Sequence, residues 1–249
     1  MKILWISANK LGHELLKEVF NQIKNQVSII TLSKDSKTVM YDGIDSNYWH
    51  DFGCDVIQVD RINDAFDCVK EINPDLIIMC GWRQIIDKNI LDIPTLGFVG
   101  FHPTLLPVGR GSAPIINSIL SGYKKSGVTM YHVSEGLDDG DIIGQESFVI
   151  EKNDHASDVY EKIIYASKKL IKKYLPLLLE NNAPRTKQDE AKATYFKKPS
   201  LKDNEIDLKN ESKEQIFRKI KALSRPYRGA YIKCGNDKLI IWKAEYVQK

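Results

Sequence analysis

Two short stretches of the sequence combine residue types that can transfer protons. The stretch GFVGFHPTLLPVGRGSAPI, residues 97–115, ends an apolar run at His102, and Pro103 follows at once. The stretch SEGLDDGD, residues 134–141, places Asp138 and two further aspartates around one glycine. A carboxylate beside an imidazole can orient the ring and form a proton-transfer pair with it. His102 and Asp138 are therefore the catalytic candidates, with a structural histidine and an ordinary acidic turn as the alternatives.

A basic turn separates His102 from the next helical pattern. The turn Gly109-Arg110-Gly111 precedes Ser112, Ala113 and Pro114, which are typical of an N-cap and the first turn of a helix. A helix N-terminus with a guanidinium beside it favours an anionic group, so Arg110 is a candidate substrate contact. The alternative is a structural turn that Arg110 pins.

Strand-like runs and helical patterns alternate along the first 182 residues. KILWIS, VSIITLS, DLIIMCG and GFVGFH are typical of buried strands, and LGHELLKEVFNQI is typical of an amphipathic helix. This order predicts a Rossmann-like α/β fold with a mostly parallel sheet covered by helices on both faces. Ligands bind beyond the carboxyl ends of such strands, so the loops SANKLG, CGWRQII, HPTLLPVGRG and SEGLDDGD should rim one crevice. The sequence has neither GxGxxG nor GxxxxGK[ST], which argues against a conventional dinucleotide or P-loop site.

The character of the chain changes after residue 182. We expect a catalytic domain over 1–182, a polar linker that wraps the surface over 183–211, and a small extension of one helix and one β-hairpin over 212–249. An isolated hairpin is only marginally stable, so the hairpin should dock on the main domain. A hydrophobic edge on the hairpin could form the contact of a homodimer.

Composition narrows the classes of partner. The 249 residues include 36 basic and 33 acidic ones, and a net charge of +3 is too small to indicate nucleic-acid binding. The four cysteines have no CxxC spacing, and we expect reduced thiols and no metal site. The N-terminus lacks the features of a signal peptide, and no apolar run is long enough to span a membrane. A cytoplasmic protein without a membrane partner is expected.

The combined motifs resemble those of the formyltransferases that use 10-formyltetrahydrofolate. HPTLLPVGRG, SGVTM and GLDDGDII carry the resemblance, which runs from the first strand to about residue 180 and continues more weakly through KKPSLKDNEIDL and IKALSRPYRGAY. The family includes glycinamide ribonucleotide transformylase, methionyl-tRNA formyltransferase and the sugar N-formyltransferases. The resemblance implies a Rossmann-like fold and direct transfer of a formyl group from the folate N10 to an amine.

The resemblance also implies roles for particular residues. The family's His and Asp fall on His102 and Asp138, but the family's Asn falls on Gly100, which has no side-chain amide. Losing one such donor typically costs about a hundredfold to a thousandfold in rate. We expect another donor to compensate, either a backbone N–H, a water or Asn117.

The remaining implied contacts concern the folate and the second substrate. The folate contacts would be Arg83, Gln84, Ile85, Ile86, Ser134, Glu135 and Gly136. Asn9 and Lys10 would contact a substrate phosphate, although a solvated Lys10 is an alternative. The small C-terminal extension is most similar to that of sugar N-formyltransferases, so the expected substrate is a nucleotide-linked amino deoxysugar for surface glycans, with a pseudaminic-type pathway as one candidate. A methionyl-tRNA formyltransferase and a folate-binding or sugar-binding pseudoenzyme are the alternatives.

Overall fold

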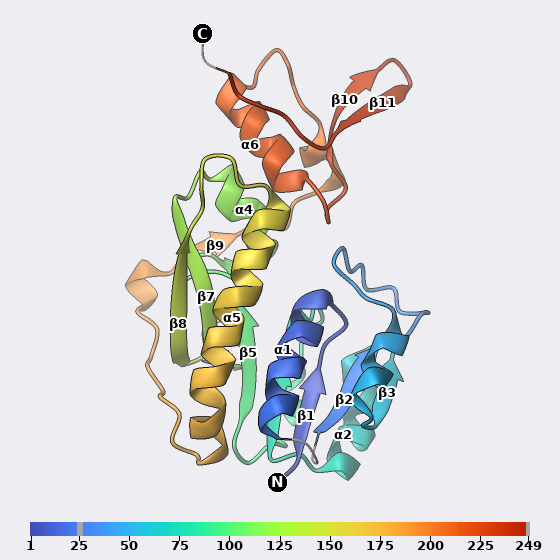
Figure 1. Ribbon diagram of the computed structural model, residues 1–249, viewed down its shortest axis with the longest axis vertical. Helices are drawn as coiled ribbons and strands as arrows, with labels where there is room; N and C mark the ends of the chain where they lie inside the picture. The colour runs from blue at the N-terminus through green and yellow to red at the C-terminus, as the bar shows by residue number, and fades with distance from the viewer. Residues whose placement is uncertain (24–26, 248–249) are drawn as a thin grey trace.

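A seven-stranded sheet forms the centre of the computed structural model, which describes residues 1–23 and 27–247 (Figure 1). The strand order is β3-β2-β1-β4-β5-β7-β8, and only β7 runs against the others. The strands are β1 (Ile3–Ile6), β2 (Val27–Leu32), β3 (Val56–Val59), β4 (Leu76–Met79), β5 (Phe98–His102), β7 (Lys125–His132) and β8 (Ile142–Val149). The predicted α/β fold with a mostly parallel sheet is confirmed.

Helices cover both faces of this sheet. They are α1 (Lys10–Gln22), α2 (Phe66–Ile72), α3 (Lys88–Leu91), α4 (Pro114–Leu120), α5 (Ala156–Leu179) and α6 (Lys213–Leu223). Short 3-10 turns are η1 (Ser46–Phe52), η2 (Ile62–Ala65), η3 (Glu190–Lys192) and η4 (Leu201–Asn204). The helices α1 and α5 lie side by side on one face, and residues of α2 and α3 pack on the other (Figure 1).

Strand β1 shows why a continuous apolar run forms a central strand. Ile3 and Trp5 belong to the core under α1 and α5, whereas Leu4 and Ile6 belong to the core on the opposite face. Successive side chains of a strand point to opposite faces, so a strand covered on both sides must be apolar at every position. All four side chains are buried.

The chain order places a topological switch point at the carboxyl ends of β1 and β4. From β1 the sheet grows outward to β2 and β3, and then continues on the other side of β1 with β4 and β5. The chain therefore leads from β1 and from β4 to strands on opposite sides of β1, and ligands bind at such a point in open α/β sheets. An added Cβ on Gly81, after β4, would lie 2.0 Å from Nδ2 of Asn9, after β1, so the two loops touch.

The C-terminal part returns to the main domain before it forms its own elements. Strand β9 (Tyr195–Phe196) pairs with β6 (Arg110–Gly111), next to the loop that follows His102. Helix α6 packs on α4 and α5, and its Ile220 and Leu223 belong to the same core as β1. The extension therefore docks through α6.

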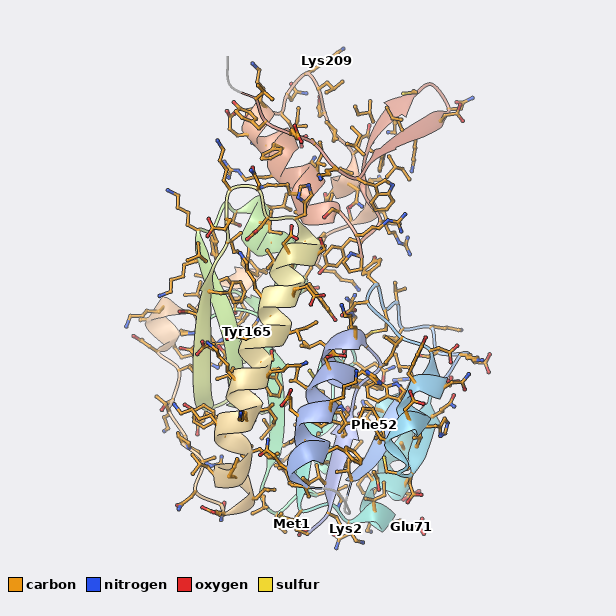
Figure 2. All side chains as sticks on the ribbon, in the orientation of Figure 1. Met1, Lys2, Phe52, Glu71, Tyr165 and Lys209 are labelled. Atoms are coloured by element: carbon orange, nitrogen blue, oxygen red, sulfur yellow. The ribbon has the colours of Figure 1, made fainter. Side chains whose placement is uncertain are left out.

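The hairpin of β10 (Ala230–Cys234) and β11 (Asp237–Ile241) projects away from the body (Figure 1). Ala230 at the start of β10 is buried in the main core, whereas Leu239 on β11 is 57% exposed, so only the base of the hairpin packs on the rest of the protein. Figure 2 places Lys209, just before the extension, at the opposite end of the molecule from Met1 and Lys2. Among the described residues, no helix has both the length and the apolar character needed to cross a membrane.

Candidate active site

His102 is the last residue of β5 and is 6% exposed. Its Nε2 lies 2.7 Å from the carbonyl oxygen of Gly109, so Nε2 carries a proton and donates it, because a carbonyl oxygen only accepts. Its Nδ1 lies 3.5 Å from Oδ2 of Asp138. A proton on Nδ1 would therefore lie between the imidazole and the carboxylate. The fold brings together the two side chains that the sequence analysis selected as catalytic.

The Asp138 carboxylate is held by donors from two other elements. Its backbone has a φ of 52°, which is uncommon for a residue other than glycine. The backbone N–H of Gly111 donates to Oδ2, and the Tyr131 hydroxyl donates to Oδ1, each at 2.8 Å. The side-chain amide of Gln188 donates to the Asp138 carbonyl oxygen at 2.8 Å. These contacts fix both the loop and the plane of the carboxylate.

Sequence reasoning did not select Tyr131 or Gln188. The alternation in GVTMYHV places Tyr131 on the same face as Thr129, but its partner across the sheet was not known. Gln188 lies in a polar stretch 50 residues after Asp138, and nothing local marks it as a contact of the site.

Arg110 has a structural environment in this fold. It is 1% exposed, and its guanidinium donates to Gln188, to both carboxylate oxygens of Glu190 and to the Tyr195 hydroxyl. Every nitrogen of the guanidinium has an acceptor, so the geometry favours the pinned turn over an anion contact.

The start of α4 differs from the expectation. Ala113, with a φ of 50°, occupies the N-cap position and makes no capping bond, whereas Ser112 lies one residue too early to cap the helix. The side-chain amide of Asn117 donates to the carbonyl oxygens of Ser112 and Lys197, at 2.8 and 3.1 Å. Those bonds occupy both N–H groups, so Asn117 is not available as the substitute donor for Gly100.

The four predicted folate residues after β4 have different orientations. Gln84 accepts from the backbone N–H of Ile62 and donates to Thr38 and Asp60, so its side chain ties this loop to its neighbours. Ile86 is buried in the core, whereas Ile85 is 83% exposed. Arg83 makes separate contacts: it donates to the Val39 carbonyl oxygen, stacks on Tyr41, and lies 3.6 Å from the Asp42 carboxylate.

The second predicted folate stretch lies against the first. The carboxylate of Glu135 pairs with Lys88 of α3 at 2.7 Å, and α3 directly follows the loop of Ile85. The Ser134 hydroxyl donates to Asp139, and an added Cβ on Gly136 would lie 1.9 Å from the same carboxylate. A side chain at 136 would therefore require the Asp139 carboxylate to move.

Asn9 and Lys10 form the start of α1. Asn9 is buried and caps the helix, because its Oδ1 accepts from the backbone N–H of Gly12 at 3.0 Å while its Nδ2 donates to Asp42 at 2.7 Å. The exposed Lys10 pairs with Glu161 at 2.6 Å. The side chain of Asn9 is therefore used in the fold, and Lys10 lies at the rim.

A proton-transfer pair therefore lies at the carboxyl end of β5, between loops that approach one another. Within residues 1–23 and 27–247, no group of three or more His, Cys, Asp or Glu side chains is placed to hold a metal ion. Acid–base chemistry by the pair His102 and Asp138 is what this arrangement offers.

Two sequence profiles match the chain over the parts that build this site and the extension. The profile described as formyl transferase matches residues 56–175, and the profile described as formyl transferase, C-terminal domain, matches residues 199–249. The chain belongs to the formyltransferase family. The matched residues include both His102 and Asp138.

A relative within this family is the methionyl-tRNA formyltransferase of Natranaerobius thermophilus, which is 33% identical over 197 residues. The match covers 78% of this chain, but the chain spans only 63% of that relative's length.

Solved formyltransferase structures match this chain over more of its length, and over more of their own length, than this relative does. The sugar N-formyltransferase from a Shewanella species has a TM-score of 0.79 at 21% identity, with coverage of 100% of this chain and 99% of that one. An N-formyltransferase from Helicobacter canadensis, described in complex with folinic acid and dTDP-3-aminofucose, has a TM-score of 0.75 at 22% identity, with coverage of 96% and 86%. At these identities the likeness concerns the fold.

Proposed function

We propose that this protein transfers a formyl group from 10-formyltetrahydrofolate to the amine of a nucleotide-linked amino deoxysugar. The contact between His102 and Asp138 at the end of β5 carries the proposal, because it supplies a proton-transfer pair where the family motifs meet. The structural likeness to sugar N-formyltransferases over the full chain supports a sugar amine as acceptor. Free thiols at all four cysteines fit a reducing compartment such as the cytoplasm.

The donor would lie between the two loops that the sequence analysis assigned to folate. Ile85 offers an exposed apolar side chain, and the bond between Lys88 and Glu135 holds the stretch 134–136 against the same region. Backbone groups of these loops are suited to hydrogen-bonding a pterin ring, while Ile85 covers apolar surface. The sugar nucleotide would enter beside the end of β1, where Lys10 is exposed.

The chemistry requires one bond exchange and one proton movement. The acceptor nitrogen forms a bond to the formyl carbon, and the bond from that carbon to N10 breaks. The proton that the acceptor loses passes to the pair of Asp138 and His102, and N10 takes a proton as it leaves. The Nε2 proton of His102 stays on Nε2, hydrogen-bonded to the Gly109 carbonyl oxygen, so the exchanged proton is the one between Nδ1 and the carboxylate.

The deciding experiment measures release of tetrahydrofolate by absorbance with a panel of nucleotide-linked amino sugars. We expect turnover with one of them, and a loss of about a thousandfold in kcat for His102→Ala. The matched control is His50→Ala, because His50 is an exposed histidine in η1. Folate binding without turnover on any amine would indicate a binding protein instead, which Gly100 would explain.

Methionyl-tRNA is the second acceptor to test, since the chain is 33% identical to a methionyl-tRNA formyltransferase. A net charge of +3 predicts weak capture of phosphates, so affinity for tRNA should be low and turnover absent. Turnover with methionyl-tRNA, together with an affinity that falls steeply with salt, would contradict the sugar assignment.

A further inference from the structure

Position 100 of β5 faces a specific partner across the sheet. In the register of β5 and β7, Gly100 pairs directly with Tyr131, and His102 pairs with Thr129. Directly paired residues, and residues two apart on one strand, share a face of the sheet. The side chain of Tyr131 therefore lies on the same face as His102 and beside the empty position at Gly100.

Glycine at position 100 leaves room for the Tyr131 ring and for Val133. A Cβ added to Gly100 would lie 3.1 Å from Cε1 of Tyr131 and 2.9 Å from Cγ2 of Val133. Both distances are shorter than ordinary carbon contacts, so a larger side chain at position 100 would force the Tyr131 ring and Val133 to shift. A side chain such as the family's asparagine at position 100 would crowd the Tyr131 ring, whereas Gly100 leaves the ring where it lies.

The hydroxyl of this tyrosine reaches the active-site carboxylate. Tyr131 is 5% exposed and donates to Oδ1 of Asp138 at 2.8 Å. Burial, together with the facing Asp138 charge, raises the pKa of Tyr131 well above its ordinary value, so the hydroxyl keeps its proton and acts only as a donor. With Gly111 donating to the other oxygen, the two bonds turn Oδ2 toward Nδ1 of His102.

We propose that Tyr131 is a positioning residue of the formyl-transfer site, and that Gly100 is the small residue that admits its ring. Tyr131 transfers no proton and touches no substrate; it orients the Asp138 carboxylate for His102. This proposal rests on the proposed function for its kinetic readout, and on the geometry alone for its spectroscopic one.

The first test is Tyr131→Phe in the full chain, which keeps the ring and removes the hydroxyl. We expect kcat to fall about tenfold, with less than a twofold change in KM for the amine, because one charge-assisted bond to the reacting pair is lost. The control is Tyr165→Phe, since Tyr165 is 65% exposed on α5 (Figure 2) and should leave kcat unchanged. An unchanged kcat for Tyr131→Phe would overturn the proposal.

The second test asks whether Tyr131 acts through Asp138. In single-turnover experiments, Tyr131→Phe should cost less than a further twofold when Asp138→Asn is already present. An equal loss in both backgrounds would mean that Tyr131 acts independently of the carboxylate, and the proposal would be wrong.

The third test needs no activity. The amide resonance of Gly111 reports its bond to Oδ2 of Asp138, so Tyr131→Phe should shift that resonance in ¹H–¹⁵N spectra and Tyr165→Phe should not. An unmoved Gly111 resonance in Tyr131→Phe would show that the carboxylate does not depend on the hydroxyl. If no amine is formylated, the proposed function fails, while this resonance still decides whether Tyr131 orients Asp138.

Discussion

The carbonyl oxygen that accepts the His102 hydrogen bond belongs to Gly109, whose backbone conformation favours glycine. Gly109 has a φ of 77°, and an added Cβ would lie 2.7 Å from a ring carbon of Phe196. Glycine adopts this left-handed conformation without the steric cost that other residues bear. The direction of the His102 imidazole therefore depends on the backbone of the loop and not only on its neighbour Asp138.

At the residue scale, Gly100→Ala tests the crowding around position 100. The new Cβ meets Val133 at 2.9 Å, so we expect the free energy of unfolding to fall by about 1–3 kcal/mol. Urea unfolding provides the measurement. The double variant with Val133→Ala should lose less than the sum of the two single losses, because the smaller side chain makes room for the methyl group. Additive losses would mean that the two positions do not crowd each other.

At the scale of elements, the loop that follows His102 is held in place by a segment from much later in the chain. Thr194 accepts from the backbone of both Gly109 and Arg110, at 2.8 and 2.9 Å, and donates its own N–H to Pro107 at 3.1 Å. Together with the pairing of β6 and β9, these bonds fix the loop that carries the Gly109 carbonyl oxygen. The predicted wrapping segment 183–211 thus includes a structural part of the site.

Arg110→Met tests the role of the buried guanidinium at this junction. Methionine keeps much of the side-chain volume but removes every donor, so we expect the free energy of unfolding to fall by about 2–4 kcal/mol. Urea unfolding and KM for the acceptor should be measured together, and KM should change less than twofold. A large rise in KM at unchanged stability would instead support the sequence-based prediction of a substrate contact.

His132, at the end of β7, should make stability depend on pH. Burial, reinforced by the charge of Arg185, lowers its pKa to about 4, while the unfolded chain has the ordinary value of about 6.5. Between these values the unfolded state binds more protons, so stability is complete above pH about 6.5 and is lost as pH falls toward 4. The nearby Asp141 opposes this shift without cancelling it.

The measurement is the melting temperature of the protein and of His132→Phe between pH 7.5 and about 4.5. The variant cannot bind the proton, so its melting temperature should fall less over this interval. Parallel curves for the two proteins would show that His132 does not contribute to the acid sensitivity.

At the scale of the whole molecule, one core connects the sheet to the C-terminal extension. The cluster that contains Trp5 of β1 also contains Ile206, Leu223 and Ala230. The C-terminal family profile, residues 199–249, therefore covers residues that share their apolar packing with the catalytic domain. The boundaries at residues 182 and 211 remain predictions from the sequence.

This shared core predicts cooperative unfolding. Leu223→Ala should lower the free energy of unfolding by about 2–5 kcal/mol, because it leaves a cavity between α6 and the helices beneath it. Calorimetry should show one transition for both proteins, shifted to lower temperature in the variant. A separate low-temperature transition in the variant would mean that the extension folds independently.

The sequence by itself determined the class of fold and the two catalytic candidates. A short continuous apolar run such as that in KILWIS is typical of a central strand, and all four side chains of β1 are buried. His102 follows one of these runs and Asp138 lies in an acidic turn, so local chemistry was enough to select both. The resemblance of the motifs then connected them to formyl transfer.

Only the tertiary structure decided which residues support that pair. The partners of Arg110 lie 78 to 85 residues away, and Tyr131 reaches Gly100 through a strand register that no local pattern specifies. The prediction of Ser112 as N-cap was wrong for the same reason. Long-range hydrogen bonds to Phe196 and Asp138 fix the turn before α4, and they place Ala113 at the N-cap position. Periodicity and motif report what a residue can do, whereas long-range pairing determines what it faces.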